Sequence, residues 1–120
     1  MEFDLERPIY QQIMDWIKMR IISGELILGQ KVEAVREMAL ELQTNPNTVQ
    51  RALGDLEREG ILFSKRGLGR FVSEDKSKIL ELKNSKVKQV TLNFLQTMTG
   101  YGFSEKETAD YLNQVIDEME

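Results

Sequence analysis

The sequence predicts a mainly α-helical chain that carries one small β-hairpin. Apolar residues recur at spacings of three and four along most of the 120 positions, which is the period of amphipathic helices. Near residue 67, two short runs of apolar and basic residues flank a glycine-bearing tip, as in a hairpin. Polar and glycine-bearing segments separate the helical stretches. We therefore expect three helices before the hairpin and two after it.

Two helices are expected at the start of the chain, and the first of them is expected to act as a scaffold. The first runs from Pro8 to about Ile22, and the second from about Ala34 to Leu42. Proline suits a first helical turn, and the segment 23–26 turns the chain after the first helix. Their apolar stripes consist of Ile9, Tyr10, Ile13, Ile17 and Ile21 on the first helix, and Val35, Met38, Ala39 and Leu42 on the second. Trp16 widens the first stripe, where a tryptophan is far more often core or interface than a ligand-stacking residue.

A third helix is expected from Asn45-Pro46 to Gly60. An Asn side chain can cap an orphan amide, proline suits the first helical position, and glycine suits a left-handed end. The apolar face consists of Val49, Ala52, Leu53 and Leu56. The side chains left outside this face are Asn47, Gln50 and Arg51, with Thr48 at its boundary. Such side chains suit base edges and phosphates.

The expected hairpin follows this helix directly. Its basic residues are Lys65, Arg66 and Arg70, and no acid lies between residues 60 and 72. Gly67 and Gly69 allow the tip to approach another backbone closely, so it could lie against phosphates or enter a minor groove. A basic hairpin alone is usually a solvated turn. Directly after two helices and a tight turn, it predicts a winged helix-turn-helix that reads duplex DNA.

Short motifs are spread across residues 8–72. They are Pro8-Ile9-Tyr10-Gln11-Gln12-Ile13, Ile22-Ser23-Gly24-Glu25-Leu26, Val35-Arg36-Glu37-Met38-Ala39, Asn47-Thr48-Val49 and Gly67-Leu68-Gly69-Arg70-Phe71-Val72. As a set they resemble the amino-terminal domain of GntR-type bacterial transcription regulators. The segment 45–51 is similar to that of the YtrA-like subfamily, whose members end in a short helical appendage.

The resemblance implies a sequence-specific, homodimeric transcription regulator that represses by occupying a palindromic or pseudo-palindromic operator. Short members of the family often control transporter operons. It also implies that Arg36 contacts DNA, although the residues leave open that Arg36 pairs with an acid such as Glu33. Glu33 and Ala34 stand where the family has Pro and Ser. This removes a helix cap and a phosphate contact, and it adds a negative charge near DNA.

Residues 73–120 are expected to form a helical dimerisation appendage after a DNA-binding domain of residues 1–72. A long helix to about Met98, a break at residues 99–103 and a last helix with a capping box at Ser104 and Glu107 are predicted. The candidate dimer contacts are Val87, Val90, Phe94, Met98, Leu112, Val115, Ile116 and Met119. Two such helices cannot form an independent core, so a second copy is the expected partner. The appendage is too short to enclose a usual effector pocket, and any effector stays unknown.

The composition and charge of the chain limit the functions that it could have. The net charge is −4, with ten basic and eleven acidic residues in 1–72, so only a local basic surface could attract DNA. The chain has no Cys and no His, and we expect no catalytic residue, metal or cofactor. No long apolar run or leader is apparent, so we expect a cytoplasmic protein without a membrane partner.

Two other functions are alternatives to DNA binding. One alternative is a winged module that binds protein or RNA. An enzyme using Glu57 and Glu59 is disfavoured, because residues two apart point to different helix faces.

Overall fold

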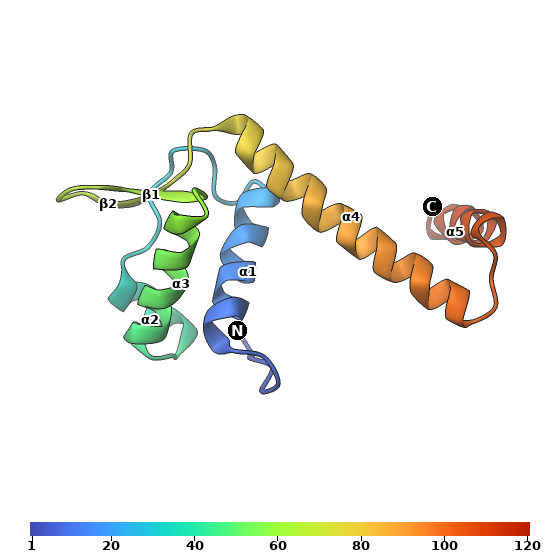
Figure 1. Cartoon of the computed structure of the whole chain (residues 1–120), viewed down its shortest axis with the longest axis horizontal. Helices are drawn as coiled ribbons and strands as arrows, with labels where there is room; N and C mark the ends of the chain where they lie inside the picture. Colours follow the sequence, from blue (N-terminus) through green and yellow to red (C-terminus); the bar gives the residue numbers. More distant parts are fainter. The chain divides into compact units, whose positions relative to one another are not determined.

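The computed structural model describes the whole chain, Met1–Glu120, as two compact units of residues 1–83 and 84–120 (Figure 1). The elements are α1 (Ile9–Ile22), α2 (Val35–Leu42), α3 (Pro46–Arg58), β1 (Leu62–Lys65), β2 (Gly69–Val72), α4 (Lys76–Gly100) and α5 (Glu105–Met119). The predicted mainly α fold with one hairpin is confirmed. The first two turns of α4 belong to the first unit, and the domain boundary after Val72 stays a prediction. None of the helices has the length and apolar character that a membrane span requires.

The first unit is built around α3. Figure 1 shows α1 and α3 side by side, with α2 packed across the start of α3. The buried core consists of Ile13, Ile17, Ile21, Leu26, Val32, Met38, Ala39, Leu42, Val49, Ala52, Leu53, Leu56, Ile61, Leu62 and Val72. Most of these are the apolar positions that the helical spacing places inward. They are joined by Leu62 and Val72 of the strands and by Leu26, Val32 and Ile61 of the connecting segments. The packing leaves the opposite face of α3 in solvent.

The turn between α2 and α3 sets the position of the exposed helix. Gln43 adopts a left-handed conformation with φ of 54°, and the amide of Thr44 bonds to the carbonyl of Ala39 at 3.0 Å. The Asn45 side chain then accepts a hydrogen bond from the Asn47 amide at 2.7 Å. Gly60 follows Glu59, the C-cap residue of α3, and has φ of 77°. The predicted cap and left-handed end of this helix are both confirmed.

The hairpin is antiparallel, with Leu62 opposite Val72 and Lys65 opposite Gly69. Its tight end needs backbone angles that glycine tolerates, because φ is 78° at Gly67 and 114° at Gly69. Lys31 forms an isolated backbone bridge to Phe71, which connects the loop before α2 to strand β2. Since Leu62 and Val72 are buried in the core, the hairpin is anchored at its base and exposed at its tip.

The second unit contains the rest of α4 and all of α5. The predicted capping box is confirmed, because Ser104 accepts from the Glu107 amide and Glu107 accepts from the Ser104 amide, both at 3.1 Å. The hydrogen bond from the Ser104 amide to the Glu107 carboxylate is also the main reason that the pKa of Glu107 lies below its ordinary value. The ring of Phe103 meets that of Tyr111 edge-on at 5.7 Å. Thr108 is the only buried residue of α5, and α4 has none.

Candidate nucleic-acid interface

The exposed side of α3 carries the predicted reading residues. Asn47, Gln50 and Arg51 are exposed, and Thr48 is half-buried at the edge of the apolar face. Asn47 and Thr48 lie in the first turn, where the helix amides without intrahelical partners also point outward. Polar side chains at the amino-terminal end of a second helix are what a helix-turn-helix presents to base edges. The structure therefore groups these four residues on one accessible surface.

Arg51 is exposed but already has a neighbour. Its guanidinium carbon lies 3.7 Å from the centre of the Tyr10 ring, in a cation–π contact between α3 and α1. This contact holds the side chain along the surface of α1. Tyr10 appeared in the sequence only as part of an apolar stripe, and its role beneath Arg51 was missed, because no local pattern links residues 41 positions apart. The stacked Arg51 retains free N–H groups that can meet a phosphate.

Arg70 connects the hairpin to α3. Its Nε donates to Glu57, and its Nη1 lies 3.5 Å from the Gln50 side-chain oxygen. Glu57 also accepts from the Ser64 hydroxyl at 2.9 Å. The hydrogen bond from Arg70, aided by that from Ser64, holds the pKa of the Glu57 carboxyl below its ordinary value. Glu57 is thus a structural tie between helix and hairpin, and Arg70 is less available to DNA than its position in the sequence suggested.

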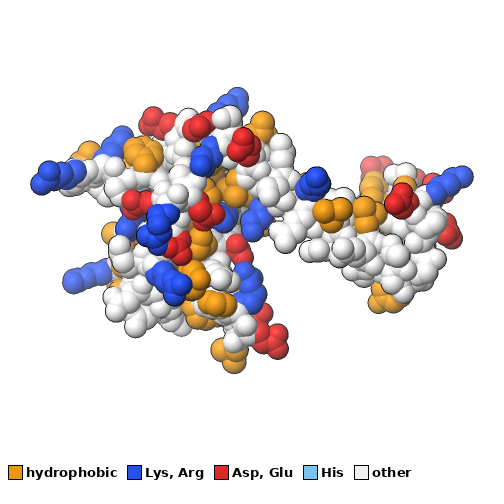
Figure 2. All heavy atoms as spheres, in the orientation of Figure 1, with side chains coloured by type: hydrophobic (Ala, Val, Ile, Leu, Met, Phe, Trp, Pro, Cys, Tyr) orange, Lys and Arg blue, Asp and Glu red, His pale blue; other side chains and the backbone are white.

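The tip of the hairpin is exposed and basic. Figure 2 shows Lys and Arg side chains gathered at the end of the hairpin. The Lys65 ammonium lies 4.7 Å from the centre of the Phe71 ring and 5.5 Å from that of Phe63. Arg66 is exposed and forms no ion pair or hydrogen bond. Together with Gly67 and Gly69, these cations form a compact surface suited to a sugar-phosphate backbone.

The start of α2 differs from what its sequence suggested. Arg36 is exposed and does not pair with Glu33, so that alternative is wrong. Glu33 instead accepts two hydrogen bonds from Arg20 of α1, at 2.6 and 3.0 Å. These bonds lower the pKa of Glu33, and the same pairing raises that of Arg20. The negative charge expected to oppose DNA is therefore neutralised within the protein.

Arg36 lines a hollow of about 310 Å³ whose other walls include Thr44 and Pro46. The structure thus brings Arg36 next to the first turn of α3, as a contact to DNA near that turn would require. Lys31 is a further exposed cation, which the sequence reading missed. It lies beside the hairpin, since a Cβ added to Gly69 would come within 3.1 Å of the Lys31 Cε. The backbone bridge of Lys31 to Phe71 places it there as well.

The solvent-facing helix α3, the tight turn between α2 and α3, and the basic hairpin after α3 together define a winged helix-turn-helix DNA-binding protein. Residues 9–72 match the family model for bacterial regulatory proteins of the gntR family. The chain belongs to this family of DNA-binding transcription regulators. This confirms the predicted resemblance, and it places the chain in a class of regulators rather than enzymes.

Relatives and solved structures agree with the family. The chain is 39% identical over 106 residues to the uncharacterized HTH-type transcriptional regulator YhcF of Bacillus subtilis, covering 88% of each chain. It is 41% identical over 83 residues to the HTH-type transcriptional repressor YtrA of the same species, covering 68% of this chain and 64% of YtrA.

Two solved structures are similar to this chain, one over nearly all of its length and the other over about half of it. A GntR family transcriptional regulator from Listeria monocytogenes superposes with a TM-score of 0.87 at 38% identity, over 93% of this chain and 98% of the other. The DNA-binding domain of AraR in complex with operator ORX1 gives a TM-score of 0.54 at 31% identity, over 56% of this chain and 81% of that one. The similarity thus includes a domain solved on operator DNA.

Proposed function

We propose that the protein is a homodimeric repressor that binds a palindromic or pseudo-palindromic operator in the cytoplasm. Residues 1–72 form its DNA-binding domain and residues 73–120 its dimerisation appendage. The observation that carries the proposal is the single accessible surface formed by the first turn of α3, Arg36 and the basic hairpin tip. The reading residues Asn47 and Gln50 are exposed, and the contact of Gln50 with Arg70 is long at 3.5 Å.

The proposed division of labour follows from the chemistry of each side chain. Asn47, Thr48 and Gln50 would contact base edges in the major groove, where amide side chains can pair bidentately with adenine. Arg36, Arg51, Lys65 and Arg66 would contact phosphates, and Gly67 and Gly69 would let the tip approach the backbone closely. Arg70 would hold the hairpin against α3 through Glu57, and it would add a phosphate contact only at the edge of the surface.

The proposal of a dimer rests on the second unit. Val87, Val90, Phe94, Leu112, Ile116 and Met119 are exposed, while Met98 and Val115 are half-buried. Val90 is 68% exposed and Met119 is 81% exposed, so α4 and α5 do not bury these residues against each other. Apolar faces of this extent mark an interface, and a two-fold partner of the same sequence satisfies both helices at once.

Repression is proposed because the family relative YtrA is named a transcriptional repressor. A dimer that occupies a promoter blocks transcription without any enzymatic step. Control of a transporter operon is likewise proposed on the resemblance to the short, YtrA-like members.

Selection of bound duplexes from a random pool tests the proposal most directly. The intact chain is expected to enrich an inverted repeat, because a two-fold dimer presents two reading helices to two half-sites. A double variant, Asn47→Ala with Gln50→Ala, is the matched control, since both residues are exposed and the fold should be kept. It should enrich a degenerate motif. Enrichment of no motif, or of one unpaired half-site by the intact chain, would contradict the proposal.

A further inference from the structure

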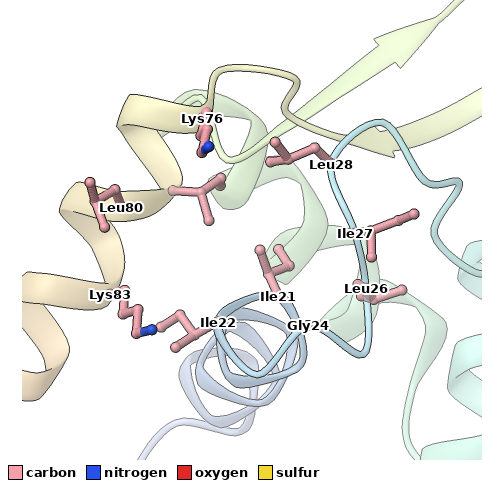
Figure 3. A pocket seen from close by; sticks show the side chains of 10 residues that line it. Ile21, Ile22, Gly24, Leu26, Ile27, Leu28, Lys76, Leu80 and Lys83 are labelled. Carbon is pink, nitrogen blue, oxygen red and sulfur yellow. The ribbon is translucent and has the colours of Figure 1, made fainter.

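An open cavity of about 290 Å³ lies within the first unit, between the loop after α1 and the first two turns of α4 (Figure 3). Aliphatic side chains form most of its wall, including Ile21, Ile22, Leu26, Leu28, Ile79 and Leu80. No carboxylate, hydroxyl or amide side chain lines it. The volume lies at the lower end of the range of small-molecule sites, which is roughly 300 to 1,000 Å³.

The apolar wall is incompletely covered. Leu80 is 54% exposed and Leu28 is 40% exposed, and they come from elements on opposite sides of the cavity. Their neighbours Leu26 and Ile21 are buried in the core, so the cavity floor is rigidly held. Solvent contact with clustered aliphatic side chains is unfavourable, and an apolar ligand that displaced this water would lower the free energy in proportion to the area it covered.

The only charged groups at the cavity are two lysines, Lys76 and Lys83. They lie seven residues apart on α4, which places them on the same face and about 10 Å apart along the helix axis. Neither forms an ion pair or a hydrogen bond with another side chain. Figure 3 shows Lys83 extending toward Ile22. Two unpaired cations beside an aliphatic wall that contains no acid create a site complementary to an anion with an apolar body.

We propose that this cavity binds a small amphiphilic anion of the medium-chain carboxylate class. The hydrocarbon chain lies against the aliphatic wall, and the carboxylate pairs with Lys76 or Lys83. A neutral amphiphile would gain the same apolar contact but no ion pair, and a cationic one would be repelled. Binding at this site does not depend on the proposed operator binding, because none of the proposed DNA contacts lines the cavity.

Three probes with the same chain length and different head groups test the proposal on the intact protein. Octanoate, octan-1-ol and octylammonium are titrated by calorimetry, and the melting temperature is followed in parallel. Octanoate is expected to bind saturably and to raise the melting temperature, since a ligand that binds only the folded state stabilises it. Octan-1-ol should bind about two- to five-fold more weakly than octanoate, because the loss of one exposed ion pair reduces affinity by about that factor. Octylammonium should bind most weakly.

Variants of the lysines separate the ion pair from the apolar contact. Lys76→Gln or Lys83→Gln should weaken octanoate binding about two- to five-fold and leave octan-1-ol binding unchanged. Lys88→Gln is the control, because Lys88 is an exposed lysine of α4 outside the cavity. Leu80→Asn should weaken octanoate and octan-1-ol alike, with an unchanged melting temperature in the absence of ligand.

Three outcomes would overturn the proposal. The first is the absence of saturable octanoate binding in the millimolar range. The second is equal affinity for all three head groups, which would mean that the lysines recognise nothing. The third is a change in sedimentation of Leu80→Asn together with no octanoate binding to the intact chain, which would mean that another copy of the protein covers the cavity. None of these readouts uses DNA, so failure here is distinguishable from failure of the proposed operator binding.

Discussion

Several cations of the proposed interface have protein neighbours before any DNA arrives. Arg51 lies on the Tyr10 ring, Lys65 lies over Phe71, and Arg70 is paired with Glu57. Each contact fixes a long side chain that would otherwise lose rotamer freedom on binding. Contact with a phosphate therefore costs less entropy for Arg51 and Lys65. For Arg70 it also costs the ion pair with Glu57, which is why its contribution should be smaller.

Replacing Gln50 tests base reading by one side chain. Gln50→Ala should weaken binding to the selected operator by about 1 to 3 kcal/mol, because a lost bidentate base contact has that magnitude. Binding to random duplex and thermal stability should change little, since Gln50 is exposed and its contact to Arg70 is long at 3.5 Å. Fluorescence anisotropy on the operator and its single-base variants measures the effect, with Gln89→Ala on α4 as control. Equal affinities on every duplex would assign the reading to other residues.

The pairing of Glu33 with Arg20 predicts a pH dependence of stability. The pKa of Glu33 is lowered in the folded chain, so the unfolded chain binds more protons once the pH nears the ordinary value of about 4.3. The stabilisation is thus complete at neutral pH and is lost as the pH falls through the folded pKa. Glu33→Gln should cost about 1 to 3 kcal/mol at neutral pH and less in acid. Urea unfolding at about pH 7 and about pH 3 measures this.

Glu37→Gln is the matched control for that measurement. Glu37 is an exposed acid of α2 and forms no ion pair with any residue. Its removal should leave the unfolding free energy nearly unchanged at both pH values. A Glu33→Gln variant that loses the same stability at neutral and acid pH would show that charge pairing with Arg20 is not the source of the effect.

At the scale of elements, the start of α3 depends on one cap. Asn45→Ala removes the acceptor of the Asn47 amide and should lower the unfolding free energy by about 1 kcal/mol, within a range of roughly 0.5 to 2. Asn45→Asp keeps an acceptor and should keep the stability, but it places a negative charge beside the DNA-facing turn and should weaken binding. Urea unfolding and anisotropy separate the two effects. Similar stability of Asn45→Ala and the unchanged chain would mean that Pro46 alone sets the helix start.

The hairpin makes a separate prediction about salt. If Lys65 and Arg66 meet phosphates, Lys65→Gln or Arg66→Gln should weaken binding to all duplexes alike and reduce the slope of log affinity against log salt by about one per contact and subunit. Sequence preference should persist. Arg66→Gln should not alter stability, because Arg66 has no protein partner. Lys106→Gln on α5 serves as control, and an unchanged slope in both hairpin variants would place the tip away from the backbone.

At the scale of the whole molecule, DNA affinity should depend on dimerisation. Ile116→Asp or Val90→Asp introduces a charge into an apolar face and should yield monomers in sedimentation equilibrium. Operator affinity should then fall by about 100- to 10,000-fold, since the second half-site no longer benefits from linkage. Asn113→Asp, an exposed change on α5 outside the apolar set, should leave both properties unaltered. Sedimentation of the intact chain as a monomer at micromolar concentration would contradict the dimer.

The local sequence was sufficient to predict the helices, the hairpin and the exposed face of α3. Asn45-Pro46, Gly60 and the capping box at Ser104 act through hydrogen bonds and backbone angles within a few residues, so their effects are visible in the sequence itself. The spacing of Val49, Ala52, Leu53 and Leu56 likewise determines which side of α3 is buried, and hence that Asn47 and Gln50 face solvent.

Only the tertiary structure decided which charged side chains remain free of protein partners and so available to contact DNA. Glu33 is neutralised by Arg20 and Arg70 is held by Glu57, in each case across 13 positions of sequence. Tyr10 lies under Arg51 because α1 packs beside α3, and Lys31 lies by the hairpin because its loop bridges to Phe71. The cavity between the loop after α1 and α4 arises in the same way. Ion pairs, ring contacts and cavities depend on distances between elements, and periodicity along the chain does not encode those distances.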